Sequence, residues 1–137
     1  MRTTPGKTLG DERDRCATIA IVRTRVLIVD DHGPFRAVAR ELLERAGYVV
    51  SGEAATATEA LQAIAADAAD AVLLDVHLPD RDGFAVATAL AIVDGPAVVL
   101  ISSRSTEDYG RRVAACGVRG FISKSKLSAA AFAALLE

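Results

Sequence analysis

The sequence predicts one doubly wound α/β domain built around a five-stranded parallel sheet. From Arg25 onward, short apolar runs alternate with segments of helical periodicity, which is the pattern of successive βα units. Several of these runs end in polar residues, and the carboxyl ends of the strands in such a sheet share the edge where ligands bind. The 137 residues are enough for one domain with a sizeable core.

The first elements are two strands and the helix between them. Residues 26–29 form the first predicted strand. The helix begins near Pro34, because proline suits a first helical turn, and it ends at Gly47. The apolar side chains between these two positions recur at helical spacing: Phe35, Val38, Ala39, Leu42, Leu43 and Ala46. Residues 48–50 form the second strand.

The middle of the chain predicts a second helix, a third strand and a third helix. Thr56 and Glu59 have the spacing of a capping box, so the second helix is expected to begin there. The third strand covers residues 71–75 and is apolar up to its last residue. The third helix covers about residues 83–92 and buries its Phe and Leu side chains.

The C-terminal part predicts the last two strands and helices. The fourth strand covers residues 97–101 and follows a Gly-Pro pair. Ser105 can cap a fourth helix that ends near Gly117. The fifth strand covers about residues 119–122, and a fifth helix begins near Ser125.

The connections between these elements define the fold. Right-handed crossovers between parallel strands place helices on both faces of the sheet. The expected result is a flavodoxin-like fold with the strand order 2-1-3-4-5. Residues 1–24 show no clear periodicity and are predicted to be a flexible N-terminal extension that precedes a domain of residues 25–137.

Composition excludes several classes of function. The net charge is -2, with 51% hydrophobic and 25% charged residues, and the absence of a basic stripe argues against direct DNA binding. No apolar run approaches the roughly 20 residues of a membrane span, and no signal-peptide core is present. Cys16 and Cys116 form no disulfide framework or metal motif, and Cys116 is expected to be a small buried residue near a helix end. A reducing cytoplasm is the expected location.

Chemically useful side chains stand at four of the strand ends. The first strand runs into Asp30 and Asp31, the third ends in Asp75, the fourth runs into Ser102, and the fifth runs into Lys124. The first and third strands are neighbours in the expected order, so the three carboxylates should converge.

Clustered carboxylates repel one another and favour a hard divalent cation. Mg²⁺ accepts one or two carboxylates together with water and phosphate oxygens. An ammonium and a hydroxyl at the neighbouring strand ends could bind phosphoryl oxygens. The arrangement predicts a cation and phosphate site in which a carboxylate could act as the nucleophile of a phosphoryl transfer.

These motifs resemble the receiver (CheY-like) domains of two-component response regulators. The resemblance covers about residues 25–137 and looks most like the NarL/LuxR-type subfamily. Members of that subfamily commonly carry a helix-turn-helix DNA-binding domain, which these 137 residues lack. The motifs that carry the resemblance are Val29-Asp30-Asp31, Asp75 with Pro79 and Gly83 at four-residue steps, Ser102, and Phe121-Ile122-Ser123-Lys124.

The resemblance implies a role for each polar residue. Asp75 would accept a phosphoryl group. Asp31 would ligate Mg²⁺ directly and Asp30 mainly through water, while Asp75 and the backbone carbonyl of His77 would complete the protein ligands. Lys124 would pair with the phosphoryl group.

Two further residues would form a switch. Ser102 would move to hydrogen-bond the phosphoryl group, and Phe121 occupies the aromatic switch position. The family often has Tyr at that position, whereas this chain has Phe and therefore no phenol there. Ser103 and Arg104 also depart from the common pattern beside the phosphoryl site. The His77 imidazole is expected to be exposed in a turn.

The predicted function is that of a phosphoacceptor receiver rather than a turnover enzyme. Its expected partners are a sensor histidine kinase or phosphotransfer protein, with possible homodimerisation. The alternative within the family is a degenerate receiver that acts as an interaction module without phosphorylation. A phosphatase or mutase with an aspartyl nucleophile would usually have a second acid two residues after the first, and that position is His77 here. A nucleotide- or flavin-binding module would need a phosphate loop where Asp30 and Asp31 would repel a phosphate.

Overall fold

The structure, a computed structural model, describes residues 24–103 and 109–136. Its sheet has five strands in the order β2-β1-β3-β4-β5, and all neighbouring pairs are parallel, which confirms the predicted fold class. The strands are β1 (Arg25–Val29), β2 (Val49–Ala54), β3 (Ala71–Asp75), β4 (Ala97–Ser102) and β5 (Gly120–Ser123).

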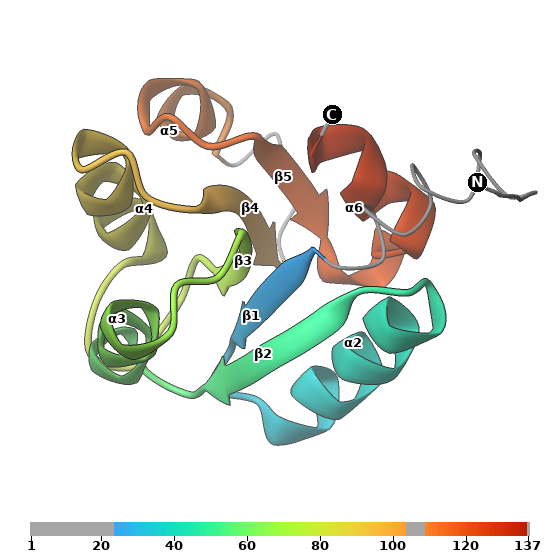
Figure 1. The fold of residues 1–137 in the computed structure, drawn as a ribbon. Helices are drawn as coiled ribbons and strands as arrows, with labels where there is room; N and C mark the ends of the chain where they lie inside the picture. The colour runs from blue at the N-terminus through green and yellow to red at the C-terminus, as the bar shows by residue number, and fades with distance from the viewer. Residues whose placement is uncertain (1–23, 104–108, 137) are drawn as a thin grey trace, which may run out of the picture.

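Helices cover both faces of this sheet, as Figure 1 shows. α2 and α6 lie on one face, and α3, α4 and α5 lie on the other. The helices are α2 (Gly33–Arg45), α3 (Ala57–Ala66), α4 (Gly83–Ile92), α5 (Gly110–Ala115) and α6 (Ala129–Leu136), with a short 3-10 turn, η2 (Lys124–Lys126), after β5. None of the described helices is long and apolar enough to cross a membrane.

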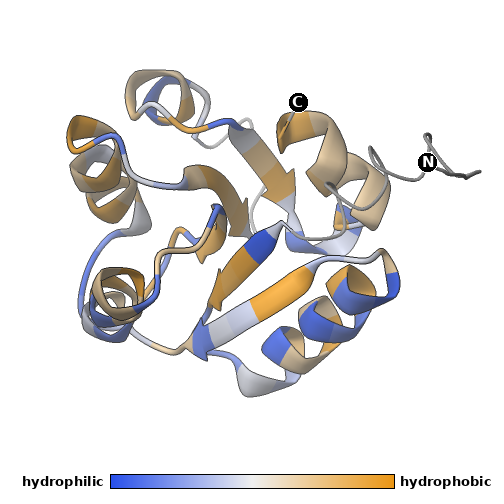
Figure 2. Ribbon diagram, in the orientation of Figure 1, coloured by the Kyte–Doolittle hydropathy of each residue, from blue (hydrophilic) through white to orange (hydrophobic). Residues whose placement is uncertain are grey.

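The central strand β3 shows how the sheet divides the core. All five of its residues are buried. Val72 and Leu74 pack with the helices α3, α4 and α5, whereas Leu73 packs with α2 and α6. Because both faces are covered, the strand reads as a continuous apolar run rather than an alternating one. Figure 2 shows hydrophobic residues along the central strands and hydrophilic residues along much of α2.

Two helix boundaries follow the predicted chemistry closely. Gly47 ends α2 with a positive φ of 99°, which glycine adopts without strain. The Thr56 hydroxyl accepts a hydrogen bond from the Glu59 amide at 3.0 Å and caps α3. The Glu59 carboxylate accepts from the amide of Ala55 at 2.8 Å, one residue before the position that a standard capping box uses.

Three boundaries differ from the prediction by several residues, while others shift by about one. β2 continues to Ala54 because its last residues pair with β1. These residues are too polar to be recognised as a strand from the sequence. α5 begins only at Gly110, while Ser105, the predicted cap, lies outside the described residues. The last helix begins at Ala129 rather than near Ser125.

A second serine explains the late start of α6. Ser125 lies in η2, and Leu127 follows in an extended conformation and packs against the core on the α2 side. The Ser128 hydroxyl then accepts a hydrogen bond from the Ala131 amide at 3.0 Å and caps the helix. The predicted extension of residues 1–24 falls outside the described part of the chain except for its last residue, so it stays a prediction.

Candidate functional site

Three carboxylates meet at the carboxyl ends of β1 and β3. The register pairs Val29 with Leu74, which places Asp30 beside Asp75 across the two neighbouring strands. Asp30 is fully buried and Asp75 is 4% exposed, whereas Asp31 is exposed. Carboxylate oxygens of the three residues lie within 4.8 Å of one another. The predicted convergence of the three carboxylates therefore occurs.

Backbone amides fix one oxygen of each buried carboxylate. The amide of His32 donates to Asp30 Oδ1 at 2.8 Å, and the amide of His77 donates to Asp75 Oδ1 at 3.1 Å. Each donor lies two residues after its acceptor, so the strand end folds back on its own side chain. The second oxygen of each carboxylate is left for other partners.

Lys124 reaches these second oxygens from the end of β5. Its Nζ lies 2.6 Å from Asp30 Oδ2 and 3.5 Å from Asp75 Oδ2. It also lies 4.8 Å from the centroid of the Phe35 ring, which covers it from the α2 side. Burial lowers the pKa of Lys124, but its close pairing with Asp30 and the nearby charge of Asp75 outweigh burial and raise the pKa above its usual value.

Asp75 is held in an environment that disfavours its charge. Burial raises the pKa of Asp75, and the neighbouring charge of Asp30 adds to that effect, while the hydrogen bond from His77 and the charge of Lys124 oppose it. The net direction is upward. An ionised carboxylate here is more basic than a surface aspartate, which suits a nucleophile.

The carboxylate cluster fits a hard cation. Asp30 Oδ2 is buried and accepts no well-directed hydrogen bond, although the Lys124 ammonium is close enough to pair with it by charge. The three side chains grouped there offer carboxylate oxygens, and oxygens are the ligands that Mg²⁺ prefers.

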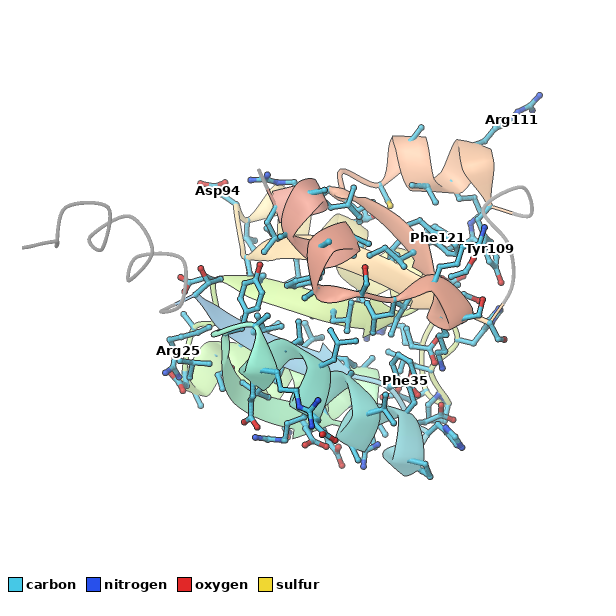
Figure 3. The ribbon with its side chains drawn as sticks, turned by 90° about the vertical axis from the view of Figure 1, so that its right-hand side faces the viewer. Arg25, Phe35, Asp94, Tyr109, Arg111 and Phe121 are labelled. Carbon is cyan, nitrogen blue, oxygen red and sulfur yellow. The ribbon has the colours of Figure 1, made fainter. Side chains whose placement is uncertain are left out.

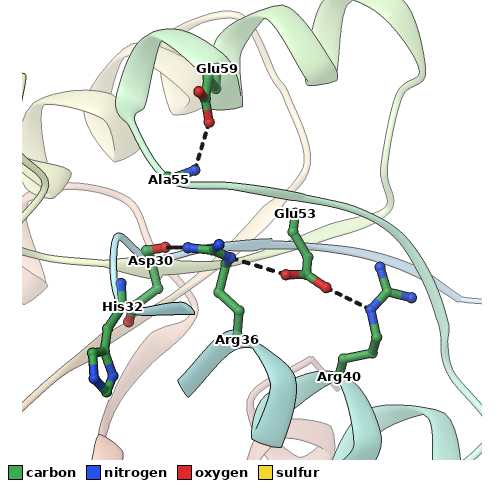
Figure 4. A network of polar contacts seen from close by, with 7 residues as sticks. All are labelled: Asp30, His32, Arg36, Arg40, Glu53, Ala55 and Glu59. Atoms are coloured by element: carbon green, nitrogen blue, oxygen red, sulfur yellow. Dashed lines mark hydrogen bonds and ion pairs between the residues drawn. The ribbon is translucent and has the colours of Figure 1, made fainter. Parts of the chain in front are cut away.

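A second polar network supports the end of β1 from α2. Arg36 donates to the backbone carbonyl of Asp30 at 2.6 Å, and its Nε donates to Glu53 on β2 at 3.0 Å (Figure 4). Arg40 donates to the other oxygen of Glu53 at 2.6 Å. The hydrogen bond from Arg40 lowers the pKa of Glu53, so this acid stays ionised. The network fixes the strand end that carries Asp30.

Ser102 and Phe121 lie where the next two strands approach the cluster. Asp75 pairs in register with Ile101, so Ser102 follows directly at the end of β4 and is fully buried. Phe121 pairs with Leu100 and is half-buried. Its ring centroid lies 5.7 Å from that of Tyr109. The buried Cys116, at the end of α5, lies as predicted.

His77 is exposed, as predicted, but its imidazole contacts Tyr109. Its Nε2 lies 2.5 Å from the Tyr109 hydroxyl, and the group that donates depends on the histidine tautomer. Sequence reasoning missed Tyr109 as a neighbour of the site. The signal available was its rarity, since the chain has two tyrosines and no tryptophan.

The fold and this cluster together define a class of protein, a flavodoxin-like domain with an acidic, lysine-paired site at its switch point. Residues 26–135 match the family model of the response regulator receiver domain. The chain therefore belongs to the response regulator receiver domain family. Receiver domains are signalling modules of two-component systems that interact with histidine kinases or phosphotransfer proteins, and they are not turnover enzymes.

Similar proteins agree with this assignment. The chain is 37% identical over 102 residues to a Pseudomonas aeruginosa protein assigned as a transcriptional regulator, covering 74% of this chain and 49% of that protein. It thus spans about half the length of that relative. A LuxR-family response regulator from Aurantimonas sp. SI85-9A1 superposes with a TM-score of 0.73 at 28% identity, covering 83% of this chain and 86% of that one.

A further structure shows the shared fold at lower identity. The receiver domain of the histidine kinase CKI1 from Arabidopsis thaliana, solved in complex with Mg²⁺, superposes with a TM-score of 0.73. It is 21% identical and covers 83% of this chain and 92% of that one. The predicted family and its NarL/LuxR-type character are confirmed by these similarities.

Proposed function

We propose that Asp75 is the phosphoacceptor of this receiver domain. The observation that carries the proposal is the placement of a buried carboxylate with a raised pKa between a lysine ammonium and two further carboxylates. In the proposed step, a carboxylate oxygen of Asp75 forms a bond to phosphorus while the bond from phosphorus to the donor breaks, and the donor leaves. The donor is the phosphohistidine of a kinase or phosphotransfer protein, or a small acyl phosphate.

Asp30, Asp31, Asp75 and the backbone carbonyl of His77 would hold a Mg²⁺ ion. A bound Mg²⁺ would supply positive charge that offsets the negative charge of the carboxylates and of the incoming phosphoryl group. The exposed Asp31 suits direct ligation at the mouth of the site, whereas the buried Asp30 is already held by an amide and by Lys124.

Lys124, Ser102 and Phe121 would respond to the phosphoryl group. Lys124 already lies 3.5 Å from Asp75 Oδ2, within reach of oxygens added there. Ser102 would donate its hydroxyl to one of them, and Phe121 would adjust its ring on the neighbouring strand. Phosphorylation would then alter the surface around α5 and β5, which a partner or a second copy of the domain can recognise. The domain would later lose the phosphoryl group by hydrolysis at Asp75.

Intact-mass measurement tests the assignment. Incubation with a small acyl phosphate and Mg²⁺ should add one phosphoryl group to the wild type and none to Asp75→Asn. Asp94→Asn is a matched control, since Asp94 is an exposed aspartate just past the end of α4, with a positive φ that asparagine also adopts. An Asp75→Asn protein that gains the group at the wild-type rate would refute the proposal.

A further inference from the structure

Helix α5 is held to the domain by few side chains. None of its residues, Gly110–Ala115, is buried. Tyr109, the residue just before the helix, is only 6% exposed and belongs to the core on the α4 side. A helix with so little buried surface depends on its end contacts for its position.

The contacts of Tyr109 lead back to the loop that follows Asp75. Its hydroxyl meets His77 Nε2 at 2.5 Å, and its ring centroid lies 5.4 Å from that of Phe84 and 5.7 Å from that of Phe121. Figure 3 shows Tyr109 and Phe121 next to each other beside the sheet. The phenol therefore lies between the acceptor loop and the ring on β5.

A second side chain of α5 reaches the same loop. Arg112 pairs with Asp82 at 2.6 Å and stacks over the Phe84 ring at 4.1 Å. Asp82 forms an isolated β-bridge with His77, which closes the loop between β3 and α4. Contacts of Tyr109 and Arg112 thus reach the loop in which the amide of His77 holds the Asp75 carboxylate.

We propose that Tyr109 is a positioning residue that couples the state of Asp75 to α5 through its hydrogen bond with His77. The inference rests on the proposed role of Asp75 as phosphoacceptor. Phe121 has no hydroxyl group, and Tyr109, just before α5, supplies a phenol beside its ring.

The direction of the coupling follows from the geometry. The His77 amide donates to Asp75 Oδ1, and the His77 imidazole contacts the Tyr109 hydroxyl. Oxygens added to Asp75 therefore displace the residue that is hydrogen-bonded to Tyr109. A hydrogen bond this short loses most of its strength when either partner shifts. Phosphorylation therefore weakens the contact and releases α5, and by reciprocity the loss of the contact favours the phosphorylated conformation.

Fluorescence of Tyr109 can report this contact directly. The chain has two tyrosines and no tryptophan, so Tyr48→Phe leaves Tyr109 as the sole emitter. Tyr48 packs edge-on against Phe132 on the α6 side of the sheet, and Phe retains that ring. An imidazole bonded to a phenol quenches its emission, so beryllofluoride with Mg²⁺ should increase the emission of the Tyr48→Phe protein.

Fluorine NMR on the same samples separates the two proposals. Bound beryllofluoride that Asp75→Asn abolishes, together with unchanged Tyr109 emission, would overturn the coupling and leave the phosphoacceptor assignment in place. Binding that survives in Asp75→Asn would overturn both.

A double-mutant cycle adds a test that ring packing alone cannot satisfy. Tyr109→Phe keeps the ring and removes the hydroxyl, and it should tighten beryllofluoride binding about threefold to tenfold, the effect of one net hydrogen bond. His77→Ala should have a similar effect, and the double variant should show no more than either single variant. Tyr48→Phe is the control and should bind like the wild type. Additive effects of Tyr109→Phe and His77→Ala would refute a role through their hydrogen bond.

Discussion

Gly83→Ala should destabilise the domain because the added methyl group meets backbone. A Cβ at position 83 would lie 2.3 Å from the carbonyl oxygen of Asp75 and 2.8 Å from the Cα of Val76. The amide of Gly83 also donates to the Val76 carbonyl at 2.7 Å, which holds the start of α4 tightly against the end of β3. The glycine is thus required by close approach rather than by an unusual φ.

The size of the effect follows from that distance. The contact is about 1 Å closer than ordinary van der Waals contact, and neither neighbour is a flexible side chain that can move aside. Overpacking costs about 1–3 kcal/mol of unfolding free energy, and a rigid backbone contact belongs at the upper end. A loss of about 3 kcal/mol would lower the melting temperature of a domain of this size by about 10 °C.

Urea denaturation followed by far-UV circular dichroism measures this change. Gly110→Ala is the matched control, because nothing lies within 4 Å of its added Cβ and the position is helical. It should be neutral or stabilise the domain by up to about 1 kcal/mol through helix propensity. If Gly83→Ala unfolds within about 0.5 kcal/mol of the wild type, the steric reasoning is wrong.

Three further predictions concern stability. Asp80 accepts hydrogen bonds from Ala57 and Thr58, which lower its pKa to about 2, so its contribution should be full above about pH 4 and fade toward pH 2; urea melts of wild type and Asp80→Asn should converge over that range. Burial raises the pKa of Asp75, so its ionised form disfavours folding above its unfolded pKa; Asp75→Asn should melt higher than wild type at pH 7 without Mg²⁺, and a lower midpoint would contradict this. Phe132 is fully buried, and Phe132→Ala should cost about 3–5 kcal/mol in urea melts.

The parts of the fold that the sequence predicted are those where burial on both faces dictates the pattern. β3 and α4 were predicted with the bounds that the structure shows, because an apolar run with a terminal aspartate and a glycine-led helix leave few alternatives. Parallel pairing then brings Asp30, Asp75 and Lys124 together, since their strands end at one edge. The cluster follows from topology without knowledge of side-chain positions.

The boundaries that failed depend on tertiary contacts. Ser125 and Ser128 are equally good caps by residue type, and the burial of Leu127 between them decides in favour of the second. The contact between His77 and Tyr109 was beyond prediction for a similar reason. It depends on the position of α5, which has no buried residue, and local sequence does not determine that position.

The carboxylate cluster leads to a last prediction, that Mg²⁺ stabilises the domain through Asp31. Asp30, Asp31 and Asp75 carry three negative charges against the one positive charge of Lys124, so the site has an excess of about two negative charges that a divalent cation offsets. At a free concentration 100 times Kd, a ligand that binds only the folded state adds about 2.7 kcal/mol to the free energy of unfolding.

Thermal melts across a MgCl₂ series should therefore show a rising midpoint in the wild type. NaCl of equal ionic strength is the control, because it screens the repulsion without occupying the site. Asp31 is exposed and lies at the mouth of the cluster, so Asp31→Asn should fold like the wild type yet need a higher MgCl₂ concentration for the same rise. Equal MgCl₂ responses in the two proteins would show that the cation acts elsewhere, and an equal response to NaCl would show that screening alone relieves the repulsion.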